Sequence, residues 1–187
     1  MNTETNNYET ERKILDSGVR RQFETGAVRD SADGRGRCDL LPLDIIGEYF
    51  ALNDINEKNE NYENILCNIN NFIRNGDELE IYKAIDLFIA LNNWSPSKAF
   101  MEVSKHYEEG AKKYAERNWE KGIPIHCYVD SGVRHFLKWI DKWDDEPHDR
   151  AFLWNMLGLL WTVRNKPELN DLPYVEKEKC CNEVNLE

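Results

Sequence analysis

The sequence predicts an all-α fold, a helical bundle of five to six helices with an N-terminal Gly/Arg-rich loop. Three observations lead to this prediction. Apolar residues recur at helical spacing in successive segments, the breaks between segments contain Pro, Gly or Asn, and no segment shows the alternation of a half-buried strand. With 187 residues, of which 41% are hydrophobic, the chain can bury the core of one domain.

The first part of the chain is expected to hold little regular structure. Residues 1–23 are polar, so we expect a flexible N-terminus. Residues 24–42 hold three glycines and three arginines, a composition typical of a loop. Residues 42–52 then predict a helix that starts with a proline, and residues 53–64, rich in Asn and Glu, predict a loop or an insertion.

Three amphipathic helices are predicted in the middle of the chain. Residues 63–76 have one apolar face and stop at Gly76, and residues 77–93 repeat the pattern. Residues 95–118 begin with Ser95, a good N-cap, and continue with a proline suited to a first turn.

Two further helices complete the predicted bundle. Residues 119–127 form a connector with Gly and Pro, and residues 128–143 form another amphipathic helix. Asp145 and Pro147 mark the start of the last helix, residues 146–164.

We therefore expect a single all-α domain over residues 24–166 and a polar C-terminal tail over residues 167–187. The formal net charge of −11 argues against binding to a membrane surface or to duplex nucleic acid, although a nucleotide carried with a divalent cation remains possible. The longest apolar run, residues 151–163, is too short to span a bilayer.

The compartment is predicted from the N-terminus and the cysteines. The N-terminus lacks the apolar stretch of a signal peptide. The five cysteines are odd in number and contain no CxxC pair. We expect reduced thiols, a cytoplasmic protein and no zinc site.

The helix over residues 95–118 carries charged residues beside its apolar stripe. Glu102, His106, Glu109 and Lys113 share one flank of that stripe, whereas Glu108 lies nearly opposite. The helical wheel alone favours a surface pair between Glu109 and Lys113. The alternative is that Glu109 approaches a partner helix.

Three consecutive acids precede the last helix. Asp144, Asp145 and Glu146 are stabilised by a helix N-terminus, and Asp145 is a good N-cap. Alternatively, such a cluster holds Mg²⁺ or Mn²⁺. His148 and Asn155 lie two turns apart on one face, and the Asn155 amide either ties two helices together or reaches a ligand.

Several arginines are candidates for binding an anion. Arg134 lies beside an apolar face and needs a partner, either an internal carboxylate such as Glu109 or Asp145, or a phosphate. The Gly/Arg-rich loop lets backbone N–H groups and guanidinium groups approach the same anion, but it is not a Walker loop. Its arginines are Arg29, Arg35 and Arg37.

The dipeptide His148–Asp149 also occurs in the metal-dependent HD phosphohydrolases. Those enzymes need a further upstream His and a downstream Asp on other helices. Because the downstream Asp171 lies in the polar tail, the sequence does not favour this interpretation.

Four segments occur in an order that resembles one phage family. They are residues 25–42, 108–124, 130–139 and 144–160. Together they resemble the phage dATP/dGTP diphosphohydrolase N-terminal-type domain, a family related to the MazG-like all-α nucleotide pyrophosphohydrolases. The comparison implies that residues 43–101 are partly a lineage-specific helical insertion.

The resemblance implies hydrolysis of a purine deoxynucleoside triphosphate, dATP or dGTP, to dNMP and pyrophosphate with Mg²⁺ or Mn²⁺. It implies metal ligation by Glu109 and Asp145, with Glu108 and Asp144 as second choices, and a catalytic role for His148 in orienting ligands or water. The substrate-binding residues that it implies are Arg29, Arg35, Arg37, Lys113 and Arg134 for the triphosphate, Asn118 and Trp119 for the base or ribose, and Asn155 for orientation.

Two other functions remain open. The chain could be a non-catalytic nucleotide-binding sponge that sequesters a signalling nucleotide of host defence, or an interaction protein with an acidic face. The resemblance also implies a homo-oligomer, a dimer or a tetramer.

Overall fold

The structure is a computed structural model that describes residue 14, residues 18–30 and residues 57–174. The helix expected over residues 42–52 and the two loop arginines Arg35 and Arg37 lie outside the described residues. The elements, in chain order, are β1 (Arg20–Gln22), β2 (Val28–Asp30), α2 (Glu57–Asn75), α3 (Glu78–Leu91), α4 (Pro96–Tyr114), the 3₁₀ helix η2 (Asn118–Lys121), α5 (Ile125–Ile140), α6 (His148–Asn165) and the 3₁₀ helix η3 (Pro167–Leu169).

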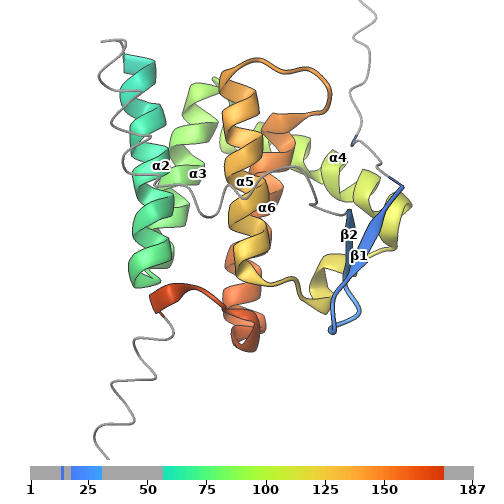
Figure 1. Ribbon diagram of the computed structural model, residues 1–187. Coiled ribbons are helices and arrows are strands. Elements are labelled where there is room, and N and C mark those ends of the chain that lie inside the picture. The colour runs from blue at the N-terminus through green and yellow to red at the C-terminus, as the bar shows by residue number, and fades with distance from the viewer. Residues whose placement is uncertain (1–13, 15–17, 31–56, 175–187) are drawn as a thin grey trace, which may run out of the picture.

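The all-α fold class is confirmed. The helices pair as α2 with α3 and α5 with α6, and α4 and α3 also pack on α6. In Figure 1, the α2–α3 pair lies on one side of the central α5–α6 pair, and α4 with the β-hairpin lies on the other. In the part of the chain that the structure describes, no helix combines the length and the apolar character needed to cross a membrane.

The core lies where α3, α5 and α6 meet. The Phe88 ring packs on Phe152 at a centroid distance of 4.4 Å and on Trp139 at 4.8 Å. Phe88, Phe136 and Phe152 are fully buried. These rings fix the positions of α5 and α6, which carry several of the polar side chains described below.

A small residue allows α5 and α6 to approach closely. A Cβ atom added at Gly158 of α6 would lie 2.5 Å from the ring of Tyr128 on α5, which is fully buried. The glycine therefore makes room for a large aromatic side chain at the helix crossing.

The structure contains two strands that the sequence did not predict. β1 and β2 form an antiparallel hairpin that pairs Arg20 with Asp30 and Gln22 with Val28. Gly26, with φ of +82°, makes the turn possible. Each strand has only three residues, too few to show an alternating pattern.

Helix boundaries differ from the prediction at several ends. The loop expected over residues 53–64 is wrong from Glu57 onward, because α2 begins there. The helix expected to end at residue 118 ends at Tyr114, because Ala115 and Arg117 have φ of 137° and 53°. Ser95 is the N-cap of α4, as predicted, and accepts from the Lys98 N–H. Asp145 is not the N-cap of α6, which follows Pro147 directly.

The beginning of the predicted polar tail packs on the helical body. Leu172 is buried, and Asp171 accepts a hydrogen bond from the backbone N–H of His126 at 3.0 Å. The Tyr174 ring lies against Gly76, whose positive φ follows the end of α2.

Candidate functional site

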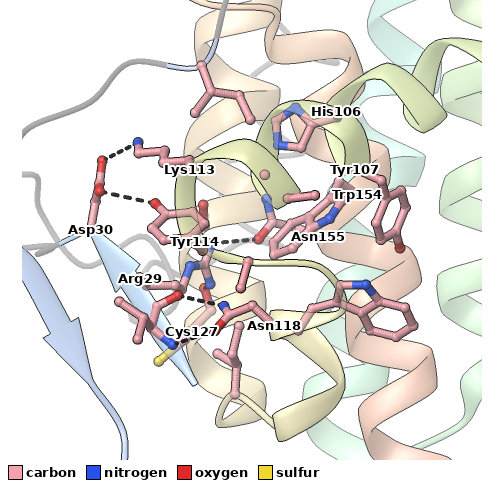
Figure 2. A pocket seen from close by; sticks show the side chains of 18 of the residues that line it. Arg29, Asp30, His106, Tyr107, Lys113, Tyr114, Asn118, Cys127, Trp154 and Asn155 are labelled. Atoms are coloured by element: carbon pink, nitrogen blue, oxygen red, sulfur yellow. Dashed lines mark hydrogen bonds and ion pairs between the residues drawn. The ribbon is translucent and has the colours of Figure 1, made fainter. Parts of the chain in front are cut away.

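A cavity of about 480 Å³ lies between the β-hairpin, the C-terminal half of α4, η2, α5 and α6. Figure 2 shows Arg29, Asp30, Lys113 and Tyr114 on one side of it and Tyr107 and Trp154 on the other. Six residues that the sequence proposed for substrate binding line it: Arg29, Lys113, Asn118, Trp119, Arg134 and Asn155. Their shared location is an observation, whereas their role in binding stays a prediction.

Arg29 on β2 is a half-buried cation that contacts α5 and α6. Its guanidinium donates to the backbone carbonyl of Cys127 at 3.0 Å and to Asn155 Oδ1 at 2.9 Å. It lies over the rings of Tyr128 and Trp154, 5.6 and 5.5 Å from their centroids. Burial lowers the pKa of Arg29. Among the described residues, no carboxylate lies within ion-pair distance of this guanidinium, so its hydrogen-bond acceptors there are neutral.

Asp30, the next residue, was missed by the sequence analysis. Its carboxylate accepts from Lys113 Nζ at 2.9 Å, from the Tyr114 hydroxyl at 3.0 Å and from Arg20 Nη1 at 2.9 Å. Figure 2 shows the contacts with Lys113 and Tyr114 as dashed lines. Burial, followed by Asp30, raises the pKa of Tyr114. Asp30 therefore joins the hairpin to the end of α4.

Asn118 anchors the hairpin to η2. Its side-chain amide donates to the Val28 carbonyl at 2.9 Å and accepts from the Val28 N–H at 3.2 Å. Thr25 adds a second anchor through its hydroxyl, which donates to the Gly122 carbonyl at 2.6 Å. The sequence proposed Asn118 for the base or ribose, and the structure shows its amide engaged by β2.

Aromatic rings form another wall of the cavity. Tyr107 lies 5.6 Å from Trp119 and 6.2 Å from Trp154, measured between ring centroids. Trp119 in turn packs edge-on against Trp161 at 4.9 Å. Such a wall offers faces on which a nucleobase can stack.

His106 presents a neutral imidazole to the same cavity. It is 8% exposed, and its Nδ1 atom has no hydrogen-bond partner among the described residues. Burial, followed by Arg150, Arg29 and Lys113, lowers the pKa of His106 to about 3. A buried polar atom of this kind is stabilised when a ligand supplies the missing partner.

Four carboxylates were expected to bind a metal ion. Among the described residues, none of them belongs to a group of three His, Cys, Asp or Glu side chains whose ligand atoms lie close together. Glu109 accepts from the Ile14 N–H at 2.9 Å and lies 3.5 Å from Arg150 Nη1. Glu108 pairs with Lys112 on the exposed side of α4. Asp144 is exposed, and the contacts of Asp145 are described below.

The sequence analysis required either an internal carboxylate or a phosphate as the partner of Arg134, and the structure shows an internal carboxylate. That partner is Asp130, one turn earlier on α5, and not the Glu109 or Asp145 that the sequence suggested. Arg150, which the sequence left unassigned, is buried and approaches Glu102 at 3.8 Å as well as Glu109.

A second group of side chains meets where α5 faces the start of α6. His135 Nδ1 lies 2.9 Å from His148 Nδ1, and these two atoms lie 3.6 and 3.8 Å from Glu146 Oε1. His148 Nε2 contacts Asp145 Oδ1 at 2.7 Å, and Asp145 Oδ2 accepts from Lys138 at 2.8 Å. The sequence assigned a catalytic role to His148 and placed Glu146 in a possible metal-binding cluster, but it assigned no role to His135.

Residues 82–172 match the family model described as dATP/dGTP diphosphohydrolase, N-terminal. The resemblance noted in the sequence is confirmed for this part of the chain. Searches of curated proteins and of solved structures found no match. The matched region contains α4, η2, α5 and α6, which supply most of the cavity wall, but not the hairpin.

Proposed function

We propose that this protein hydrolyses dATP or dGTP to dNMP and pyrophosphate, because residues 82–172 match the family model described as dATP/dGTP diphosphohydrolase, N-terminal. The observation that carries the proposal is Arg29, a guanidinium held inside the cavity by neutral acceptors. A desolvated cation of this kind favours an anionic ligand, and its planar fork suits phosphate oxygens.

The cations on the cavity wall support binding of a triphosphate. Lys113 and Arg134 line the cavity with Arg29. Lys113 pairs with Asp30, and Arg134 pairs with Asp130. Charge-assisted hydrogen bonds to phosphate oxygens are stronger than those between neutral groups. The triphosphate is therefore proposed to lie against β2 and the facing ends of α4 and α5.

The aromatic wall supports binding of a base. Tyr107, Trp119 and Trp154 surround one end of the cavity, and the unpartnered Nδ1 of His106 lies near Trp154. A neutral imidazole offers one donor and one acceptor to a purine edge. The cavity volume also falls within the range of roughly 300–1,000 Å³ found for small-ligand sites.

Mg²⁺ or Mn²⁺ remains the proposed cofactor of this reaction, since a divalent cation commonly accompanies a nucleoside triphosphate. Glu109, Asp145, Glu108 and Asp144 do not fit as its joint ligands, because they do not converge. No step is therefore assigned to a cation held by those four carboxylates.

The test is a panel of dNTPs and NTPs incubated with Mg²⁺ or Mn²⁺, with the products separated by chromatography. We expect dAMP or dGMP with pyrophosphate. Arg29→Ala is expected to lower kcat/KM at least about 100-fold, because it removes the charged contact to phosphate. Arg164→Ala is the matched control, since this arginine pairs with Glu78 on the surface and does not line the cavity.

Release of inorganic phosphate instead of pyrophosphate would overturn the proposed reaction. Full activity of Arg29→Ala would overturn the proposed site. The separation of the four expected carboxylates favours one alternative, a protein that binds a nucleotide without cleaving it. Isothermal titration without metal, followed by recovery of an intact ligand, would identify that binder.

A further inference from the structure

The group formed by His135, Glu146 and His148 has the composition of a metal site. The three ligand atoms lie within 4.8 Å of one another, which no other set of three His, Cys, Asp or Glu side chains achieves among the described residues. Two ligands bound tetrahedrally at about 2.1 Å from Zn²⁺ are separated by about 3.4 Å. The observed separations of 2.9, 3.6 and 3.8 Å are close to this value.

Asp145 gives the group the support that metal-binding histidines usually have. It contacts Nε2 of His148, so the Nε2 hydrogen donates to a carboxylate and Nδ1 is left as an acceptor. His135 Nδ1 must then carry the hydrogen that joins the two rings. When a cation binds, that hydrogen would move to Nε2 of His135, and both Nδ1 atoms would then donate lone pairs to the cation.

The three side chains of this group are largely buried and lie beside the cavity. The side chains of His148, Glu146 and His135 are 1%, 12% and 14% exposed. His135 and Glu146 line the cavity, so the open side of the group faces it.

We propose that His135 Nδ1, His148 Nδ1 and the Glu146 carboxylate bind one divalent transition-metal cation, Zn²⁺ or Mn²⁺, beside the cavity. Two imidazoles and one carboxylate suit these cations better than Mg²⁺, which prefers oxygen ligands. Three protein ligands leave coordination positions for water or another ligand. The site replaces the metal ligands expected from the sequence and gives Asp145 a positioning role.

Metal uptake by tag-free, chelator-treated protein tests the proposal without any nucleotide, so the result is independent of the proposed hydrolysis. Isothermal titration with ZnCl₂, MnCl₂ and MgCl₂ is expected to show one equivalent of Zn²⁺ or Mn²⁺ per chain and weaker binding of Mg²⁺. His135→Ala and Glu146→Gln are expected to lower the affinity at least tenfold. His126→Gln is the matched control, because it removes an imidazole from the same helix but outside the group.

A measurement on the unmodified protein covers the case in which the variants do not fold. The chain has only four histidines, so long-range ¹H–¹⁵N spectra resolve each ring. Zn²⁺ is expected to shift Nδ1 of His135 and His148 and to leave the rings of His106 and His126 unchanged. Absence of uptake, equal affinity of His135→Ala and wild type, or shifts confined to the other two rings would overturn the site.

Discussion

At the scale of single residues, the cavity depends on groups that hold other groups in place. Asn155 uses both ends of its amide, since Oδ1 accepts from Arg29 and Nδ2 donates to the Ala151 carbonyl at 2.7 Å. The sequence left two roles open for this amide. The contacts show that it supports a cation of the cavity, and they do not require that it touch a ligand itself.

Asn155→Ala is expected to weaken nucleotide binding roughly tenfold, because Arg29 loses the acceptor that aims its guanidinium. Asn165→Ala is the control. Asn165 makes the same type of contact one turn back, to the Trp161 carbonyl, but lies exposed at the end of α6. Titration calorimetry with a non-hydrolysable dATP analogue gives both affinities, and equal values for Asn155→Ala and wild type would contradict the supporting role.

His126 and Asp171 form an ion pair whose effect on stability depends on pH. Asp171, followed by Cys127, raises the pKa of His126 to about 10. A raised pKa in the folded state means that the pair stabilises fully below the unfolded value near 6.5 and loses this contribution as pH rises towards 10. We expect the melting temperature of wild type to exceed that of Asp171→Asn at pH 6, and the difference to shrink by pH 10.

Other groups that titrate between pH 6 and pH 10 are present in both wild type and Asp171→Asn. Their effect therefore cancels in the difference between the two melting temperatures. Thermal unfolding in buffers from pH 6 to pH 10 measures it. A difference that grows with pH would show that His126 is not charged by its contact with Asp171.

At the scale of secondary structure elements, the close crossing of α5 and α6 depends on Gly158. Gly158→Ala is expected to lower the free energy of unfolding by about 1–3 kcal/mol, because the added methyl group meets the buried Tyr128 ring. Gly110→Ala, also within a helix but with open space around it, is expected to raise that free energy by about 0.5–1 kcal/mol. Urea unfolding of both variants measures these changes, and a stabilised Gly158→Ala would refute the packing argument.

The helices were predictable from the sequence, and the hairpin was not. Apolar periodicity and caps such as Ser95 are local, so they identify a helix without knowledge of the rest of the chain. A three-residue strand carries no such pattern. Its pairing also relies on the Asn118 amide, which is 90 residues away from Val28 in sequence.

The site was predictable to a similar degree. Arg29, Lys113 and Arg134 line one cavity as their chemistry suggested. The partners of the carboxylates were not predictable, because a helical wheel shows the direction of a side chain but not what it meets. Likewise, the approach of His135 to His148 depends on how α5 and α6 face each other, which spacing alone does not determine.

At the scale of the whole molecule, the cavity is closed by joining two unlike parts, a β-hairpin and a helical body. Val28→Pro is expected to abolish nucleotide binding while the helical circular dichroism stays near that of wild type. Proline removes the N–H that donates to Asn118 and fixes a backbone angle in β2, so Arg29 loses its position. Titration calorimetry and circular dichroism are measured on the same samples.

Glu24→Pro is the control in the same hairpin. Glu24 is exposed at the second position of the turn closed by the Gly26 N–H and the Phe23 carbonyl, where proline is tolerated. Retained nucleotide binding by Val28→Pro would show that the hairpin does not complete the cavity.

The Asp30 carboxylate also bears on selectivity. In the structure it accepts hydrogen bonds from the amine of Lys113 and the hydroxyl of Tyr114, the same bonds that a phosphate oxygen would accept. A phosphate group that binds Lys113 and Tyr114 would therefore have to displace the Asp30 carboxylate from them. A single small anion gains little from this exchange, whereas a molecule that also stacks on the tryptophans and reaches Arg29 gains several contacts at once. If the proposed function is correct, we therefore expect the cavity to bind whole nucleotides in preference to free phosphate.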